Sequence, residues 1–540
     1  MIKVIDIFAG PGGLSEGFSR VEDKDKHKVY DIVLSIEKDF LAHQTLKLRA
    51  FSRAFEYPLP EAYYQYLRGE IDLKDLYDKH PREAKEAERK CWKFELKDDK
   101  ESVQLTTSKI IEALNGDRDF VLIGGPPCQA YSIAGRSRNA RNTGYDETKD
   151  EKQVLYKEYL QILADHEPVI FIMENVKGLL SSEYQNEKIV DKIIKDLENP
   201  KTAMEQEGRE VCNPNYPEYS IYSLVDGKLL DGRNPSYAVI RSERYGIPQK
   251  RHRVILLGIR KDINDIKPSP LELEDPVELH RVIDDLPKLR SSLSKEDDSL
   301  NDWIRAITSI ENEEWFKNLE SDNKFHKLTR YIRHVLSDMG ESTLEAGQSF
   351  VEGDFYVDFR NDWYRPSNLS GVTLHETRSH IRKDLHRYLF AACFAKVYKK
   401  SPVLNDFPTE LLPNHANVKK ATRKNGNFAD RFRVQLSDRP STTVVSHISK
   451  DGHYYIHPDP LQCRSFTVRE AARVQTFPDD YYFCGKKTSQ YQQVGNAVPP
   501  ILARKIGQVV YDILVRAKLI TPDQLPLKVQ TSISDEKLGE

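Results

Sequence analysis

The chain has 540 residues, 39% of them hydrophobic and 31% charged, with a formal net charge of −3. That length exceeds what one hydrophobic core needs, so we expect a globular protein with at least two packed units. No apolar run reaches the roughly 18 residues of a membrane span, and the N-terminus leads into a predicted strand instead of a signal peptide. The six cysteines include no C-x-x-C pair, which argues against disulfides and structural zinc and predicts a cytoplasmic protein.

Apolar runs alternate with helical segments through the first half of the sequence. Alternation of strand and helix predicts an α/β fold with a parallel sheet that is covered on both faces. The charged, tyrosine-rich segment 46–105 is interpreted as an insertion on this scaffold. Strands are predicted at 3–8, 32–36, 120–123, 169–173 and 254–259, with helices between them, for example at 153–165 and 186–197.

The alternation stops at about residue 266, where charge blocks, prolines and histidines take its place. Residues 371–440 carry 14 Lys and Arg against 6 Asp and Glu, whereas residues 291–320 carry 3 against 8. A local basic surface on a nearly neutral chain suits a nucleic-acid contact, and a solvated basic face explains it equally well. We expect an α/β part at 1–265, a smaller irregular domain at 266–462, a helix-rich return at 463–522 and a frayed tail at 523–540.

The stretch DIFAGPGGLSEGF, at the end of the first predicted strand, is rich in glycine. Gly10, Gly12 and Gly13 allow the backbone to approach a ligand closely, although Ser15 replaces the third glycine of a dinucleotide-binding loop. Glu37, at the end of the next strand, could accept hydrogen bonds from two ribose hydroxyls. An ordinary tight turn and a solvated strand end are the alternatives.

A cysteine follows the next strand in the stretch VLIGGPPCQAYS. Pro126 and Pro127 restrict the backbone and hold Cys128 at the carboxyl end of a parallel strand, where α/β proteins build their sites. An inert buried cysteine is the alternative, but such a residue normally lies inside an apolar run and not beside Gln129 and Ser132.

Three later stretches also carry polar side chains at predicted strand or helix ends. Glu174 follows Phe-Ile-Met in FIMENVKG, so partial desolvation would favour its protonated form. Arg251 and Arg253 alternate into a strand, which places them on one face, or they guard a strand edge against pairing. Asn496 in QVGNAVPP fits a backbone or ligand contact, and RSFTVREAARVQTFPDDYYF predicts an amphipathic helix with a capping residue.

In identity and order, these motifs resemble those of the DNA (cytosine-5) methyltransferases of bacterial restriction-modification systems. The resemblance covers roughly 1–45, 118–260 and 430–505. It implies a Rossmann-like methyltransferase sheet that uses S-adenosyl-L-methionine. The α/β part and the helix-rich return would then form the catalytic and cofactor-binding domain, and the segment between them would form the target-recognition domain.

The resemblance also implies a mechanism. Cys128 would attack C6 of a flipped-out cytosine, and C5 would then take the methyl group of the cofactor. Glu174 would protonate or hydrogen-bond N3, and Arg253, supported by Arg251, would contact O2. The acid at the adenine edge is hard to place, with Glu95 as a candidate. The residues implied in cofactor binding are Phe8, Ala9, Gly10, Gly12, Gly13, Leu14, Glu37, Pro127 and Asn496.

The basic segment 134–144 fits the mobile loop that closes over DNA in this family, and a solvated loop is the alternative. His375, His380 and His386 are predicted to be contacts or surface residues, because no cysteine or ligand-spaced acid cluster accompanies them, and we expect no metal site. The residues implied in DNA binding are Gln129, Ser132, Arg136, Arg138 and Arg141.

The resemblance implies that the partner is double-stranded DNA and that the protein acts in DNA methylation as a monomer. It also allows a cognate restriction endonuclease on a separate chain. A transfer-RNA cytosine-5 methyltransferase shares these motifs but carries a smaller variable region. A catalytically inactive DNA-binding homologue would have lost its cysteine or its Glu174, and this chain keeps both.

Overall fold

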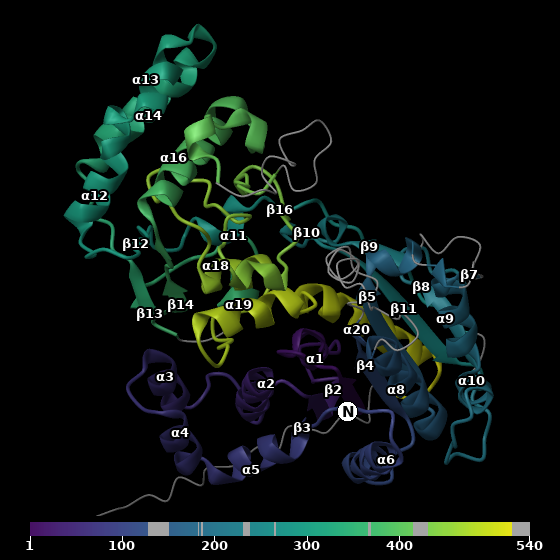
Figure 1. Cartoon of the computed structure of the whole chain (residues 1–540). Helices are drawn as coiled ribbons and strands as arrows, with labels where there is room; N and C mark the ends of the chain where they lie inside the picture. Colours follow the sequence, from purple (N-terminus) through teal and green to yellow (C-terminus); the bar gives the residue numbers. More distant parts are fainter. Residues whose placement is uncertain are drawn as a thin grey trace, which may run out of the picture.

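The computed structural model has a mixed eight-stranded sheet at its centre (Figure 1). It describes residues 1–127, 151–181, 183–184, 187–230, 238–263, 266–365, 369–413 and 430–520. The strand order is β3-β2-β1-β4-β5-β11-β8, and β9 pairs with β11. The strands are β1 (Ile2–Ile7), β2 (Tyr30–Glu37), β3 (Cys91–Lys93), β4 (Phe120–Gly124), β5 (Ile170–Val176), β8 (Tyr219–Ser223), β9 (Val239–Arg241) and β11 (His252–Arg260).

The prediction of a wholly parallel sheet is wrong for the strand near residue 254. β3, β2, β1, β4 and β5 are parallel, but β11 runs antiparallel to β5, β8 and β9. Only residues 242–251 join β9 to β11, which is shorter than the crossover of a dozen or more residues that a parallel pair needs. An apolar run carries no information on strand direction, so the sequence pattern could not reveal this reversal.

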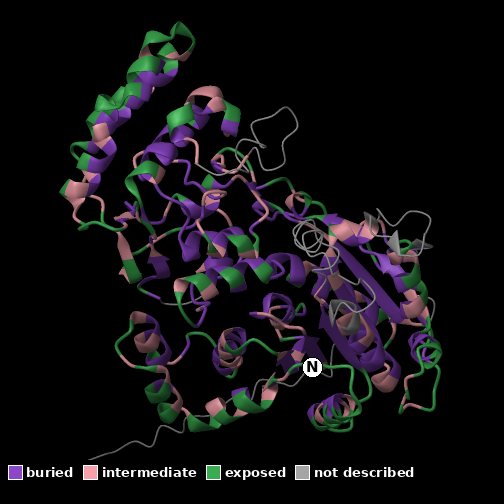
Figure 2. Ribbon diagram, viewed as in Figure 1, coloured by how far each residue is buried: buried purple, intermediate pink, exposed green. Residues whose placement is uncertain are grey.

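Helices cover both faces of the sheet, as predicted. On one face, α1 (Gly13–Ser19) and α20 (Pro500–Arg516) share a hydrophobic core with Val4 of β1. On the other face, α6 (Lys100–Leu114), α8 (Glu151–His166) and α9 (Ile189–Glu198) form a second core with Ile5 and Ile7. Figure 2 shows the sheet buried between these two layers. The helices predicted at 153–165 and 186–197 are therefore confirmed with small boundary shifts.

The segment 46–105 is only partly an insertion. Its last strand, β3, pairs in parallel with the end of β2 and forms one edge of the central sheet. The helices before β3 pack into a separate hydrophobic cluster. A three-residue edge strand, Cys-Trp-Lys, has too few apolar residues to stand out in a sequence. The helices are α2 (Phe40–Arg53), α3 (Glu61–Arg68), α4 (Leu73–Lys79) and α5 (Pro81–Lys90).

The middle of the chain forms a second lobe around its own hydrophobic core. Three helices form an arm that projects away from the sheet in Figure 1 and packs on α16 (Arg382–Tyr398). The arm helices are α12 (Leu300–Thr308), α13 (Glu314–Ser321) and α14 (His326–Met339). Short elements complete the two lobes: α10 (Pro200–Gln206), α11 (His280–Ile283), α15 (Asn361–Tyr364), β6 (Glu183–Tyr184), β7 (Glu187–Lys188), β10 (Gln249–Lys250), β12 (Ser292–Leu293), β13 (Gly347–Glu352), β14 (Gly371–Glu376), β15 (Ser379–His380) and β16 (Ser441–Thr442).

The helix-rich return contains α18 (Val468–Val474) and α19 (Lys487–Asn496) before α20. The predicted cap is present, because Thr467 and Glu470 form a reciprocal capping box at the start of α18. The predicted amphipathic character is wrong, because every residue of α18 is buried. Its arginines stay buried through specific partners, as Arg473 forms an ion pair with Asp479 at 2.7 Å.

Three histidines that were predicted to be contacts or surface residues are buried instead. His375 is fully buried, and His380 and His386 are 5% and 6% exposed. Backbone carbonyls of distant segments hold two of the rings: the Nε2 atom of His375 lies 2.8 Å from the oxygen of Pro287, and that of His386 lies 2.8 Å from the oxygen of Ala306. Within the described residues, no helix is long and apolar enough to span a membrane.

Candidate active site

The ends of three neighbouring strands meet at one edge of the sheet. The last residues of β1 and β4, Ile7 and Gly124, are paired in register, and Gly124 is also paired with Met173 of β5. The residues that follow these positions are Phe8, the Gly-Pro-Pro turn and Glu174. Strand register therefore brings three motifs together that lie more than 40 residues apart along the chain, at the edge where α/β proteins build their sites.

Glu174 forms an ion pair with Arg253 at this edge. The carboxylate oxygen lies 2.8 Å from the Nε atom of Arg253, and the two side chains are 16% and 14% exposed. Gly125 lies directly against this carboxylate, because a Cβ atom added there would lie 2.9 Å from an oxygen of Glu174. The structure thus gives Glu174 a charged partner, whereas the sequence predicted only an apolar surrounding.

The chain from Gly125 leads through Pro127 towards the predicted nucleophile. Pro127 is partly exposed, and it is the last residue of this turn that the structure describes. The predicted site residues outside the described part of the chain are Cys128, Gln129, Ser132, Arg136, Arg138 and Arg141.

Arg251 lies in the interior, where it connects distant segments. Its guanidinium donates to the carbonyl of Val444 at 2.6 Å and to that of Gly495 at 3.3 Å. Burial holds the pKa of this guanidinium well below its usual value, and the nearby Arg253 lowers it further. Arg251 therefore stabilises the backbone behind the candidate site, whereas the side chain of Arg253 lies at the surface of the site.

The glycines of the first loop have different surroundings. A Cβ atom added at Gly13 would lie 2.1 Å from the carbonyl oxygen of Val498, and one at Gly12 would lie 2.8 Å from Leu46. Both glycines are therefore needed for packing. A Cβ atom at Gly10 would meet nothing within 4 Å, so Gly10 faces open space and leaves room for a ligand.

The half-exposed and buried residues around this loop offer groups that suit a nucleoside. Phe8 and Ala9 are partly exposed beside Gly10, whereas Leu14 is buried. Glu37 accepts a hydrogen bond from the backbone N–H of Gly10 at 2.8 Å, and burial raises the pKa of its carboxyl group. The carboxylate thus lies at the loop, with lone pairs left to accept further hydrogen bonds.

Glu95 lies two residues after the end of β3, the strand that pairs with the end of β2. The backbone N–H of Phe94 donates to the carbonyl of Glu37 at 3.1 Å, and Glu95 pairs with Lys38 at 3.3 Å. Trp92 and Phe94 stack with their ring centroids 3.9 Å apart. In the structure, the candidate adenine-edge acid and a stacked aromatic pair therefore lie near Glu37. The irregular spacing of the sequence had not allowed their position to be predicted.

Asp6 is a buried acid that the sequence analysis did not single out. It is fully buried, and neither carboxylate oxygen has a hydrogen-bond partner among the described residues. Burial raises its pKa to about 7. Its position within a strand of apolar residues was the available signal, since an acid inside such a run is seldom structural without a partner.

The chain's C-terminal segments hold the glycine loop in place. The hydroxyl of Tyr481 donates to the carbonyl of Pro11, and Val498 packs on Gly13. Asn496 is exposed at the end of α19, two residues before Val498. Asn496 thus lies two residues from a residue that contacts the loop, and its role in the cofactor pocket stays a prediction.

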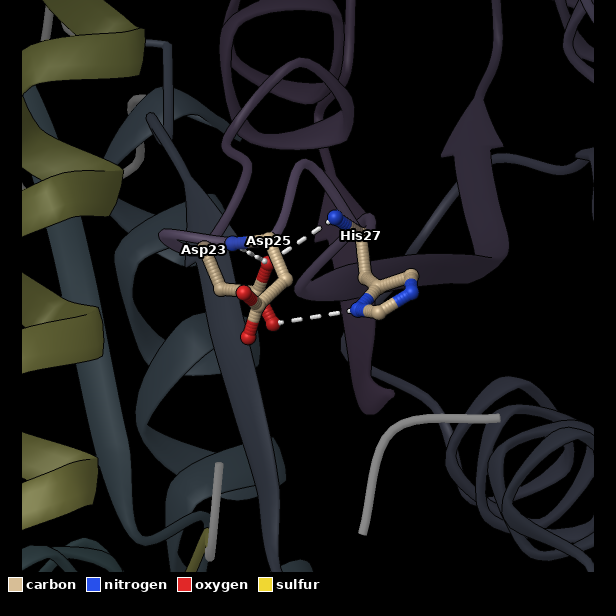
Figure 3. Close-up of side chains that lie close together, drawn as sticks. All are labelled: Asp23, Asp25 and His27. Atoms are coloured by element: carbon tan, nitrogen blue, oxygen red, sulfur yellow. Dashed lines mark hydrogen bonds and ion pairs between the residues drawn. The ribbon is translucent and has the colours of Figure 1, made fainter. Parts of the chain in front are cut away.

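Asp23, Asp25 and His27 form a small polar group on the turn before β2 (Figure 3). One oxygen of Asp23 accepts hydrogen bonds from the backbone N–H groups of Asp25 and His27, both at 2.9 Å. The other oxygen lies 3.5 Å from the ring of His27. These contacts stabilise the turn. They explain, without a bound ion, why the three side chains lie close together.

The chain is similar to known proteins over most of its length. The family model described as C-5 cytosine-specific DNA methylase matches residues 82–201 and 231–512. Over 531 residues the chain is 31% identical to the type II methyltransferase M.Bpa9945I of Bacillus paralicheniformis, which covers 95% of this chain and 99% of that protein. It is also 24% identical to the type II methyltransferase M.DdeI of Desulfomicrobium norvegicum, over 98% and 92% of the two chains. The chain therefore belongs to the family of C-5 cytosine-specific DNA methylases, and it is a DNA (cytosine-5) methyltransferase.

Proposed function

We propose that this enzyme transfers a methyl group from S-adenosyl-L-methionine to C5 of a flipped-out cytosine within a specific double-stranded DNA sequence, through a covalent bond between Cys128 and C6. The observation that carries the proposal is the Glu174–Arg253 ion pair at the strand edge from which the turn to Cys128 departs. An acid and a guanidinium at this position suit the N3 and O2 atoms of cytosine.

The chemical problem is that C5 of cytosine is a poor nucleophile. Addition of the Cys128 thiolate to C6 forms the S–C6 bond and pushes electrons from the C5–C6 double bond towards N3 and C5. Glu174 supplies a proton or hydrogen bond at N3, and Arg253 orients this carboxyl group and donates to O2. C5 can then take the methyl group. A base removes the C5 proton, the S–C6 bond breaks, and the thiolate leaves.

The cofactor, when bound, supplies an electrophilic methyl group on a sulfonium centre. The residues at the loop fit its nucleoside half: Gly10 leaves room, Glu37 offers a carboxylate to the ribose hydroxyls, and Phe8 offers a half-exposed ring to the adenine. We assign Glu95 to accept from the adenine amino group, because it lies just beyond β3, which pairs with the end of β2. We assign Asn496 and Pro127 to the same pocket.

A role in a restriction-modification system follows from the relatives. Two of the proteins that this chain resembles over more than 90% of its length are named type II methyltransferases. We propose that this enzyme, acting as a monomer, likewise protects DNA at the sites of a cognate endonuclease on a separate chain.

Bisulfite sequencing of plasmid DNA from cells that express the protein tests the proposal. We expect 5-methylcytosine at one recurring sequence, and its absence with the wild-type protein would contradict the proposed activity. Cys128→Ala should abolish methylation while cofactor binding, measured by calorimetry, stays within about threefold of wild type, because the thiol acts on the base and not on the cofactor.

A matched control is Cys212→Ala, which changes an exposed cysteine on a loop away from the strand edge. It should methylate like wild type. DNA that contains 5-fluorocytosine should become covalently trapped on the wild-type and Cys212→Ala proteins but not on Cys128→Ala, because fluorine cannot leave C5 as a proton does. Equal trapping of all three would exclude Cys128 as the nucleophile.

A further inference from the structure

An unexpected basic surface lies on the arm of the second lobe. By sequence, the neighbouring window 291–320 is acidic. On α14, however, Lys327, Arg330, Tyr331 and His334 follow one another at helical spacing and therefore share one face of the helix. With Val397 of α16 they line a groove of about 440 Å³, and no acidic residue is part of its lining.

Two cations of this groove, Lys327 and Arg330, have no ion-pair partner among the described residues, whereas the ring of His334 lies 3.6 Å from a carboxylate oxygen of Asp338. Among the described residues, neither Lys327 nor Arg330 has a carboxylate within 4.0 Å, and both are exposed. Two nearby acids, Glu311 and Glu320, are already paired with Arg333. Lys327 and Arg330 therefore keep their positive charges available for an external anion.

We propose that this basic groove binds the sugar-phosphate backbone of the substrate duplex outside the recognition sequence. The inference rests on the proposed duplex substrate. Charge complementarity favours DNA, because unpaired Lys and Arg beside an aromatic side chain are typical of phosphate contacts that position a duplex without reading its bases. The arm stands apart from the central sheet in Figure 1, so phosphates bound there would lie away from the target cytosine.

The test is methyl transfer by Lys327→Glu/Arg330→Glu on two duplexes that carry the recognition sequence found by bisulfite sequencing. On a duplex of about 40 base pairs we expect KM for DNA to rise about tenfold with kcat within about twofold, and the slope of log affinity against log salt to fall by about two, one for each lost phosphate contact. On a duplex of about 12 base pairs, which ends before the arm, KM should equal that of wild type.

Two variants control for charge and for folding. Arg82→Glu/Lys85→Glu places the same charge change on the exposed face of α5, near the opposite end of the molecule in Figure 1, and should leave both KM values unchanged. Lys327→Arg/Arg330→Lys keeps the charge of the groove and should keep the wild-type KM on the long duplex. A rise in that conservative variant would assign a structural role to the two residues and overturn the proposal.

Other outcomes also overturn it. Unchanged KM values for Lys327→Glu/Arg330→Glu on both duplexes would mean that the groove takes another partner, such as an acidic protein surface. An equal rise on both duplexes would place its effect at the target site itself. Failure of the wild-type enzyme to methylate any DNA would instead contradict the proposed function, so the two failures are distinguishable.

Discussion

At His375, burial decides which protonation state the fold can hold. The ring lies 3.0 Å from the hydroxyl of Thr467 through Nδ1 and 2.8 Å from the carbonyl of Pro287 through Nε2. The carbonyl requires a hydrogen on Nε2, and in the neutral ring Nδ1 then accepts from the hydroxyl. Burial lowers the pKa of His375 to about 4.

This shift predicts a loss of stability in mild acid. The unfolded chain protonates its histidines near pH 6.5, whereas folded His375 stays neutral until about pH 4. Its contribution is therefore fully present above pH 6.5 and is lost as the pH falls towards 4, by up to about 1.4 kcal/mol per pH unit. Thermal unfolding from pH 7 to pH 4.5 should show a shallower pH dependence in His375→Gln than in wild type. The same change at the exposed His326 should keep the wild-type slope, and identical slopes in all three proteins would refute the assignment.

Two arginines that are two residues apart, at the start of β11, have separate roles. Arg251 joins the β10 region to the segment after β16 and to the end of α19 through carbonyls nearly 200 or more residues away. Arg253 pairs with Glu174 at the end of β5. The alternating pattern predicted that both arginines lie on one side of the strand. Only the elements packed around that strand show that Arg251 has a structural role and that Arg253 lies at the candidate site.

The two methionine variants should therefore fail in different ways. Arg251→Met leaves the buried carbonyls of Val444 and Gly495 without a donor, and we expect it to lower the free energy of unfolding by about 3 kcal/mol. Arg253→Met should cost less stability than Arg251→Met, because its side chain reaches the surface of the site, but it should lower kcat by about 100-fold, or roughly 3 kcal/mol of transition-state stabilisation. Urea unfolding and steady-state kinetics of both proteins check this, and a stability loss confined to Arg253→Met would reverse the assignment.

On the scale of the whole molecule, the two ends of the described chain meet across one face of the sheet. α1 and α20 approach so closely at Gly17 that an added Cβ atom would lie 2.4 Å from Ala503 and from the carbonyl of Pro500. The last described helix, α20, therefore packs against the first, α1, within one core. The second lobe is inserted in the chain between these two helices.

Gly17→Ala should accordingly destabilise the protein as a whole. A methyl group at this crossing overpacks two helices, at a cost of about 1–3 kcal/mol. Gly340→Ala, at the end of α14, is the matched control, because its nearest neighbour would be 3.3 Å away and its backbone is already right-handed helical. Chemical denaturation should show a lower midpoint for Gly17→Ala alone, and equal midpoints would mean that the two helices can separate.

The sequence by itself determined the fold class, the family and the strand ends at which the chemical groups lie, because each motif is a local pattern of apolar run, turn and polar residue. The assignments of Cys128 and of the DNA-contact residues stay predictions. Only the tertiary structure decided the direction of β11, the place of β3 in the sheet, the burial of His375 and the basic face of α14. The first three depend on contacts with residues far away along the chain, which no local sequence pattern records. The basic face of α14 depends on helix geometry, which brings Lys327, Arg330 and His334, which are separated in the sequence, to one side of the helix.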